Sequence, residues 1–93
     1  MKIELAEQVV AFVKGLAPEP RRLLTLAIID LAKEKGDIKS LQADLEGFWR
    51  LRVKSYRVIF RYVNGHVIRC EFVENRSVVY ELFAIELMKL REP

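Results

Sequence analysis

Hydrophobic and polar positions follow two different periods along this chain, helical in the first half and strand-like in the second. Apolar side chains recur every three or four residues from Ala6 to Gly15 and from Pro20 to about Lys35, which predicts two helices. Gly36 follows the second helix as a C-terminal stop, and the prolines in Ala17–Pro20 predict a turn between the two helices. Ahead of them, Met1–Leu5 predicts a short strand.

From residue 48 onward the period is two, which predicts strands at Phe48–Val53 and Tyr56–Tyr62, joined by a turn at Lys54 and Ser55. Pairing the strands around this turn gives an apolar face on which Val53 meets Tyr56, Leu51 meets Val58, and Trp49 meets Phe60. On the reverse face Arg52 lies opposite Arg57, Arg50 opposite Ile59, and Phe48 opposite Arg61. Like charges that face each other across strands are destabilising, so solubility alone does not explain this arrangement.

A second hairpin is predicted around Asn64 and Gly65, because both residues tolerate the positive φ of tight turns. A two-residue Asn-Gly loop would pair Phe60 with Arg69 and mix charge into the core. A three-residue loop, residues 63–65, aligns apolar residues instead, and burial therefore favours it. Its expected pairs are Phe60 with Ile68, Val58 with Cys70, Tyr56 with Phe72, and Arg57 with Glu71.

The remaining segments are less regular. Asp37–Gly47 is predicted to be a polar connector and Glu74–Ser77 a polar break after the third strand. Val78–Tyr80 predicts a short strand or turn, and Glu81–Arg91 predicts a terminal helix. That helix is unusually apolar for a chain end, so we expect it either to pack on the sheet or to offer a surface to a partner.

Composition places the chain among small globular proteins. Its 93 residues are enough for one domain, residues 1–93, and the 52% hydrophobic content argues against disorder. No apolar run approaches the roughly 20 residues of a membrane helix, and the N-terminus lacks the pattern of a secretory signal. The single cysteine, Cys70, lies in a strand pattern and is expected to be buried in a reducing, cytoplasmic protein. With one cysteine and one histidine we expect no metal site and no cofactor.

Positive charge is concentrated in one window, from Gly47 to Cys70, which has no Asp or Glu. The window carries +6 and the whole chain +3, so the remainder carries −3. A basic sheet face on an acidic body is typical of proteins that bind polyanions, nucleic acid above all. The alternative is a solvated face whose long side chains cover apolar surface. The six basic residues are Arg50, Arg52, Lys54, Arg57, Arg61 and Arg69.

Three further residues are candidate catalytic groups. His66, the only histidine, falls beside a predicted turn, where a histidine is usually just exposed. Glu46 directly precedes the basic strands, and we expect it to form a structural salt bridge. Tyr80 has the spacing of a core aromatic residue with its hydroxyl at the edge.

The segment Leu45–Phe60, Leu-Glu-Gly-Phe-Trp-Arg-Leu-Arg-Val-Lys-Ser-Tyr-Arg-Val-Ile-Phe, resembles the central block of the RelE/ParE toxin superfamily of toxin–antitoxin systems. That family ends in a His-Arg pair and a tyrosine, and residues 75–80, Asn-Arg-Ser-Val-Val-Tyr, match this ending. The resemblance implies an α+β fold. An N-terminal short strand and a two-helix hairpin would pack on one face of a twisted, mainly antiparallel sheet, with a C-terminal helix.

The resemblance also implies a function. RelE-like toxins enter the ribosomal A site and cut mRNA without a metal, by attack of a ribose 2′-hydroxyl on the adjacent phosphate, and a cognate antitoxin protein neutralises them. By position, Arg57, Arg76 and Tyr80 match the catalytic residues. Arg50 and Arg52 match the family's basic pair and are expected to hold flanking phosphates, and Lys54 and Arg61 of the basic face are expected to bind RNA with them. The implied assembly is a homodimer or a toxin–antitoxin hetero-oligomer.

The sequence departs from the family pattern in two places, and these keep other functions open. Asn75 stands where the family has histidine, which leaves Glu46 as the one candidate for a general base, and Lys54-Ser55 replaces a glycine-containing turn. One alternative is a ParE-like toxin that inhibits DNA gyrase. Another is a catalytically degenerate member that binds only its antitoxin and DNA.

Overall fold

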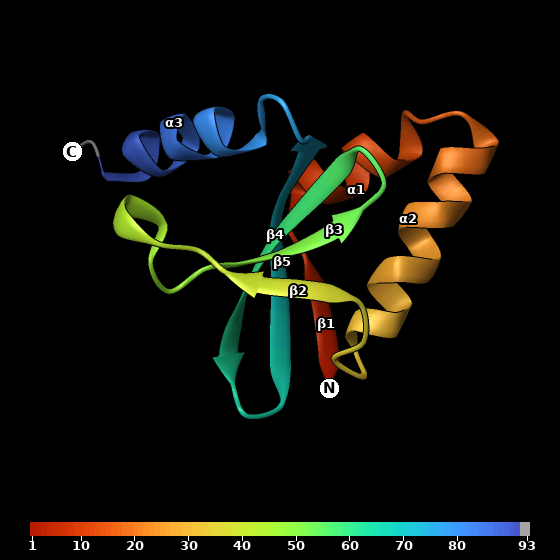
Figure 1. Cartoon of the computed structure of the whole chain (residues 1–93), viewed down its shortest axis with the longest axis horizontal. Coiled ribbons are helices and arrows are strands. Elements are labelled where there is room, and N and C mark those ends of the chain that lie inside the picture. Colours follow the sequence, from red (N-terminus) through yellow and green to blue (C-terminus); the bar gives the residue numbers. More distant parts are fainter. Residues whose placement is uncertain (92–93) are drawn as a thin grey trace.

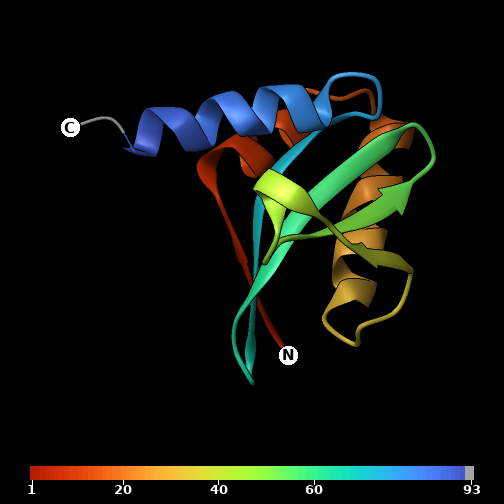
Figure 2. The same ribbon diagram turned by 60° about the vertical axis from the view of Figure 1, so that its left-hand side comes forward.

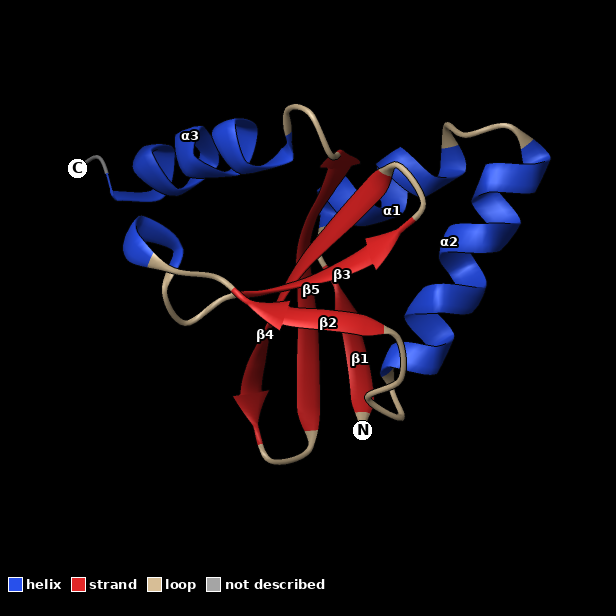
Figure 3. Cartoon of the chain, in the orientation of Figure 1, coloured by secondary structure: helices blue, strands red, loops and turns tan. Residues whose placement is uncertain are grey.

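A five-stranded sheet with three α-helices makes up the computed structural model, which describes residues 1–91 (Figure 1). The strand order is β1-β5-β4-β3-β2; β1 is parallel to β5, and every other neighbouring pair is antiparallel. The predicted α+β class is therefore confirmed (Figure 3). In chain order the elements are β1 (Lys2–Leu5), α1 (Glu7–Lys14), α2 (Pro18–Leu31), β2 (Asp37–Ser40), a 3₁₀ turn η1 (Ala43–Leu45), β3 (Trp49–Val53), β4 (Tyr56–Asn64), β5 (Val67–Asn75) and α3 (Val79–Arg91).

The boundaries of α2 differ from the prediction at both ends. The helix begins at Pro18, so the predicted proline turn is wrong. Proline is tolerated in the first helical turn because the N–H that it lacks would have no partner in the helix there. The helix ends at Leu31 rather than near Lys35, and the chain then reverses through Glu34, whose φ is 54°, and Gly36, whose φ is 121°.

One face of the sheet packs against α1 and α2 and forms the main core. Val9 of α1 and Leu24 and Leu31 of α2 are fully buried against Val58 and Phe60 of β4. The apolar face predicted for the first hairpin is thus confirmed. The buried members of this cluster are Val9, Leu24, Ile28, Leu31, Leu51, Val53, Val58, Phe60, Ile68, Cys70 and Val73.

The register of the first hairpin is as predicted, from Val53 opposite Tyr56 to Trp49 opposite Phe60, and Arg52 lies opposite Arg57. The predicted pairing of Phe48 with Arg61 is wrong, because β3 begins at Trp49. Phe48 instead packs edge-to-face against Phe83 of α3, with ring centroids 5.0 Å apart. This contact draws Phe48 out of the ladder and under the helix.

The register predicted for the second hairpin is wrong. Two residues, Gly65 and His66, lie between β4 and β5, and Phe60 pairs with Cys70 rather than Ile68. Register shifts fall between Tyr62 and Asn64 and between Ile59 and Phe60, which leaves Val63 on β4 and Glu71 on β5 as extra residues. A bulge changes which face the following side chains occupy. Beyond Glu71, Phe72 therefore lies on the face opposite the main core, beside Ile59, and Arg57 pairs with Glu74 instead of Glu71.

That second face is partly covered by α3, which lies on the other side of the sheet from α1 and α2 (Figure 2). The helix begins at Val79, so the short strand or turn predicted at Val78–Tyr80 is wrong. The first turns of α3 bury their apolar side chains against Ile59 and Phe72 of the sheet. The cluster consists of Ile59, Phe72, Val79 and Phe83, with Leu41, Leu45, Phe48, Tyr80 and Leu87 packed around it.

Two segments predicted to be irregular contribute strands. Residues 37–40 of the predicted connector form β2, which pairs with β3 along the outer edge of the sheet. β5 continues into the predicted break and ends at Asn75. Beyond the end of β1, Gln8 of α1 holds this part of β5: its amide donates to Val73 O at 2.6 Å and accepts from Val73 N at 2.8 Å. The end of β5 is thereby fixed next to α1.

Cys70 is buried in the main core, as predicted, and burial raises the pKa of its thiol to about 12, with a smaller contribution from Glu71. A raised pKa means that the fold favours the neutral thiol. The resulting stability is complete below the ordinary thiol pKa and is lost as the pH rises from about 9 toward about 12. We therefore expect the stability difference between wild type and Cys70→Ala, measured by urea unfolding, to shrink across this range. Burial and Glu34 also raise the pKa of Tyr62. Because Tyr62 is present in both proteins, its contribution to the stability difference cancels. A stability difference that stays constant across this pH range would contradict the raised pKa of Cys70.

Candidate functional site

One end of the sheet gathers four of the predicted site residues: Arg52, Lys54, Arg57 and Arg76. We call them the basic cluster. Arg52 and Arg57 form the second cross-strand pair from the β3–β4 turn, which consists of Lys54 and Ser55. The main-chain N–H of Arg76 donates to Ser55 O in the same turn at 2.7 Å. Two segments that are far apart in sequence are thus joined at this turn.

Arg57 is held in place by the turn itself. Its Nη1 donates to Lys54 O at 2.9 Å and to Tyr56 O at 2.8 Å, and the side chain is half-buried. No other hydrogen bond and no ion pair of this guanidinium group is found within residues 1–91, so Nε and Nη2 keep their N–H groups for a ligand. A guanidinium anchored on one side loses less conformational freedom when it binds a phosphate on the other.

Lys54 adopts a backbone conformation that glycine takes up most easily. Its φ is 55°, in the left-handed region, which costs a non-glycine residue about 1–2 kcal/mol. Strain of this kind is common at functional sites. The side chain is exposed beside the basic cluster.

Carboxylates flank the basic pair in the sheet. The register aligns Asp37 of β2, Arg52 of β3, Arg57 of β4 and Glu74 of β5 in one row across four strands. Neither acid is predicted as a site residue from the sequence, because each comes from outside the basic window and from a segment predicted to be a connector or a break. The signal that could have found Glu74 is its place just before the matched Asn-Arg ending.

The other basic side chains of this face already have carboxylate partners. Arg50 binds Asp37 through its carbonyl at 2.9 Å and its carboxylate at 3.1 Å. Arg61 binds Glu71 at 3.2 Å, and Arg69 binds the same glutamate at 2.6 Å. For Arg50 and Arg61 to hold phosphates, as predicted, these ion pairs would have to exchange.

The segment that carries Arg76 is ordered by the residue at the family's histidine position. Asn75 Oδ1 accepts from Ser77 N at 3.1 Å and from Ser77 Oγ at 2.9 Å. An asparagine side chain that accepts from the backbone two residues on stabilises a turn. Asn75 therefore acts here as a turn former, and it presents Arg76 to solvent.

Tyr80 lies in the first turn of α3, half-buried at the rim of the second apolar cluster. Within residues 1–91 its hydroxyl has no hydrogen-bond partner. The ring is thus positioned by packing, while the hydroxyl is left for solvent or a ligand.

Two candidates lie away from the basic cluster. His66 is exposed in the β4–β5 turn, at the opposite end of the sheet (Figure 1). Glu46 is exposed just after η1, and the predicted salt bridge is absent: no ion pair of Glu46 occurs in the described part of the chain. Nor do the described residues contain a group of three or more His, Cys, Asp or Glu side chains that could hold a metal ion.

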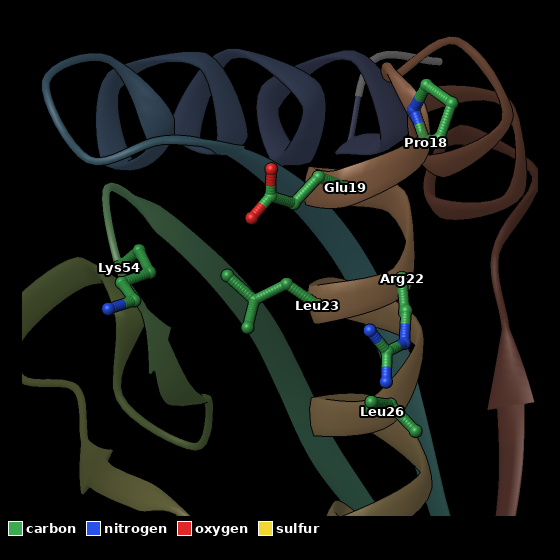
Figure 4. Close-up of a pocket in the computed structure, with 6 residues that line it drawn as sticks. All are labelled: Pro18, Glu19, Arg22, Leu23, Leu26 and Lys54. Carbon is green, nitrogen blue, oxygen red and sulfur yellow. The ribbon is translucent and has the colours of Figure 1, made fainter.

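A groove of about 560 Å³ borders the basic cluster, between α2 and the β3–β4 turn (Figure 4). Glu19 and Leu23 extend from α2 toward this turn, and Lys54 forms the opposite wall. The floor is apolar and the rim is charged, so the groove suits a peptide segment better than a bare phosphate. Its lining residues are Pro18, Glu19, Arg22, Leu23, Leu26 and Lys54.

No protein-family model matches the sequence, and no curated protein is significantly similar to it. Solved structures do match. A chain of the RelBE2 toxin–antitoxin complex from Mycobacterium tuberculosis superimposes with a TM-score of 0.71 at 20% identity, over 81% of this chain and 96% of that one. A chain of the RelB–RelE antitoxin–toxin complex from Methanococcus jannaschii gives 0.66 at 26% identity, over 86% and 98%. The YoeB/ParE toxin from Agrobacterium tumefaciens gives 0.65 at 15% identity, over 81% and 98%.

These likenesses extend over most of this chain and nearly all of each neighbour. The chain therefore has the fold of the RelE-like toxin superfamily, which confirms the resemblance seen in its sequence. Two of these neighbours are chains of toxin–antitoxin complexes, and the third is a toxin. No helix within residues 1–91 is long and apolar enough to cross a membrane.

Proposed function

We propose that this protein is the toxin of a type II toxin–antitoxin system and that it cuts mRNA on the ribosome as a metal-independent endoribonuclease. The observation that carries the proposal is the convergence of Arg57 and Arg76 at the β3–β4 turn, through the 2.7 Å bond from Arg76 N to Ser55 O. Solvation alone does not require two arginines from distant segments at the end of one sheet. Structural neighbours from RelE-type toxin–antitoxin complexes support the same reading.

The proposed chemistry is attack of a ribose 2′-oxygen on the adjacent phosphate. Negative charge develops on the phosphoryl oxygens in the transition state, and guanidinium groups that are already oriented stabilise it most effectively. Arg57, anchored on two carbonyls, and Arg76 would supply this charge. Arg52 and Lys54 would hold the flanking phosphates, and Tyr80 would stack on a base or protonate the leaving 5′-oxygen.

A second candidate function is a ParE-like toxin that binds DNA gyrase and does not cut RNA. The observation that favours it is Asn75, which is committed to Ser77 and cannot transfer a proton as histidine does. A degenerate member that only binds its antitoxin is a third reading and predicts no toxicity.

One induction experiment separates these functions. We expect expression of the chain in bacterial cells to stop growth and to create new mRNA 5′ ends within translated regions, while plasmid supercoiling stays normal. Loss of supercoiling without new 5′ ends would favour the gyrase inhibitor. Normal growth with abundant folded protein would leave only antitoxin binding.

We further propose that a cognate antitoxin binds the basic cluster and the exposed apolar side of α3. Leu82 and Ile85 of α3, and Val78 just before the helix, are each more than one-third exposed, and Met88 of α3 is 64% exposed. An acidic, amphipathic segment would complement both surfaces. We expect a small protein that is encoded next to this chain to co-purify with it as a hetero-oligomer.

The charge contribution can be measured by calorimetry at two salt concentrations. Changing Arg52 and Arg57 together to alanine should weaken the complex at low salt and flatten its salt dependence, because the screened attraction is removed. Equal affinity of wild type and double variant at both concentrations would contradict binding at the basic cluster.

A further inference from the structure

Glu74 is the carboxylate that the sheet places directly beside Arg57, and we propose that it accepts the proton of the attacking 2′-hydroxyl. The inference rests on the proposed ribonuclease function, and it supplies the general base that residue 75, as asparagine, cannot be. Glu74 and Arg57 are cross-strand partners in the β4–β5 ladder. Directly opposed residues have Cβ atoms about 4.5–5.5 Å apart on the same face, so a phosphodiester bound by Arg57 lies within reach of Glu74.

The carboxylate of Glu74 is positioned but not fully used. Its Oε2 accepts from Asn75 N at 2.9 Å, which orients the group, and the side chain is half-buried. In the described part of the chain Oε1 has no partner, and no ion pair joins Glu74 to Arg57 despite their register. If Glu74 served only to neutralise Arg57, the two side chains would form an ion pair. Glu74 instead leaves both the guanidinium and an oxygen free for a ligand.

Other groups near Arg57 are excluded as the base. Glu19 extends toward the turn from α2, which packs on the face of the sheet opposite Arg57 and Glu74. Arg52, Lys54 and Arg76 are cations at neutral pH, and asparagine has no basic site. Asp37, the other acid of the row, is bound to Arg50 at 3.1 Å. Glu46 lies beyond the opposite end of β3 from the turn that holds Arg57.

Oε1 of Glu74 takes the 2′-hydroxyl proton while the 2′-oxygen forms a bond to phosphorus. The bond from phosphorus to the 5′-oxygen breaks, and that oxygen takes a proton from Tyr80 or water. The products are a 2′,3′-cyclic phosphate and a 5′-hydroxyl end, with no oxidation or reduction.

Glu74→Gln tests the assignment, because glutamine keeps the oxygen that accepts from Asn75 N but cannot take up a proton at neutral pH. The assay is single-turnover cleavage of a short mRNA on purified ribosomes. We expect a rate loss of about 10²–10⁴-fold, with unchanged binding of an mRNA that carries 2′-deoxyribose at the cut site. Glu86→Gln removes the same charge from the exposed side of α3 and should cleave normally.

A substrate with sulfur in place of the 5′-bridging oxygen separates base from acid, since a thiolate leaves without protonation. The Glu74→Gln defect should persist on this substrate, whereas a Tyr80→Phe defect caused by lost protonation should be relieved. Normal cleavage by Glu74→Gln, an equal loss of binding, rescue by the sulfur substrate, or inactivation by Glu46→Gln instead would each overturn the assignment while the ribonuclease function stands. Absence of cleavage by the wild type would overturn both.

Discussion

Arg57→Ala should abolish toxicity and lower the cleavage rate on ribosomes about 10²–10³-fold, as expected when one transition-state charge contact is lost. Arg57 is the member of the basic cluster whose guanidinium is anchored, through Lys54 O and Tyr56 O, and so it is the best organised to meet a phosphate. The measurement is growth after induction together with single-turnover cleavage. Arg57→Lys should restore only part of the activity, because a point charge cannot replace a bidentate fork.

The fold should survive this change. Alanine removes two hydrogen bonds, to Lys54 O in the turn and to Tyr56 O at the start of β4, but it also relieves the repulsion between Arg57 and Arg52, so we expect a melting temperature close to that of the wild type. Arg69→Ala is a matched control: it removes an arginine from the same face of the sheet that is already bound to Glu71. Full toxicity of Arg57→Ala at normal abundance would rule out the ribonuclease mechanism and favour the gyrase reading.

Phe60→Ala should lower the free energy of unfolding by about 3–5 kcal/mol, as truncation of a fully buried aromatic residue does. Phe60 is 0% exposed in the main core. Its ring packs edge-to-face against the ring of Tyr62, with the ring centroids 5.7 Å apart. A domain of this size has about 5–15 kcal/mol of stability in total. We expect urea unfolding to show a much lower midpoint.

Phe60→Leu keeps most of the volume and should cost less than half as much. The contrasting control is Leu90→Ala in α3, where the leucine is 81% exposed and should contribute almost nothing. A small effect of Phe60→Ala would mean that the sheet and the two helices do not close around this ring.

The five ladder pairs of the first hairpin, from Trp49 with Phe60 to Val53 with Tyr56, could all be predicted from the sequence, although the further pair of Phe48 with Arg61 does not form. The strands of this hairpin alternate cleanly, and the turn is only two residues long, so burial of Leu51 and Val58 admits a single register. The second hairpin could not, because the bulges at Val63 and Glu71 leave no mark on local periodicity. A bulge is favoured by what each face must pack against, and here Phe72 turns to meet α3.

Elements with little local signal were also missed. β2 has four residues at the edge of the sheet and shows no run of apolar alternation; it forms because β3 offers it an open edge. α3 begins two residues earlier than expected, because Val79 finds an apolar cluster to join.

For the candidate site, the sequence by itself determined which residues carry positive charge and that Arg52 and Arg57 face each other. The tertiary structure alone decided which of those charges remain free. It brought Asp37 to Arg50 and Glu71 to Arg61, and it aligned Glu74 with Arg57. The physical reason is that charge neutralisation depends on distance in space, and the strands that supply these carboxylates are ordered by the sheet and not by the chain.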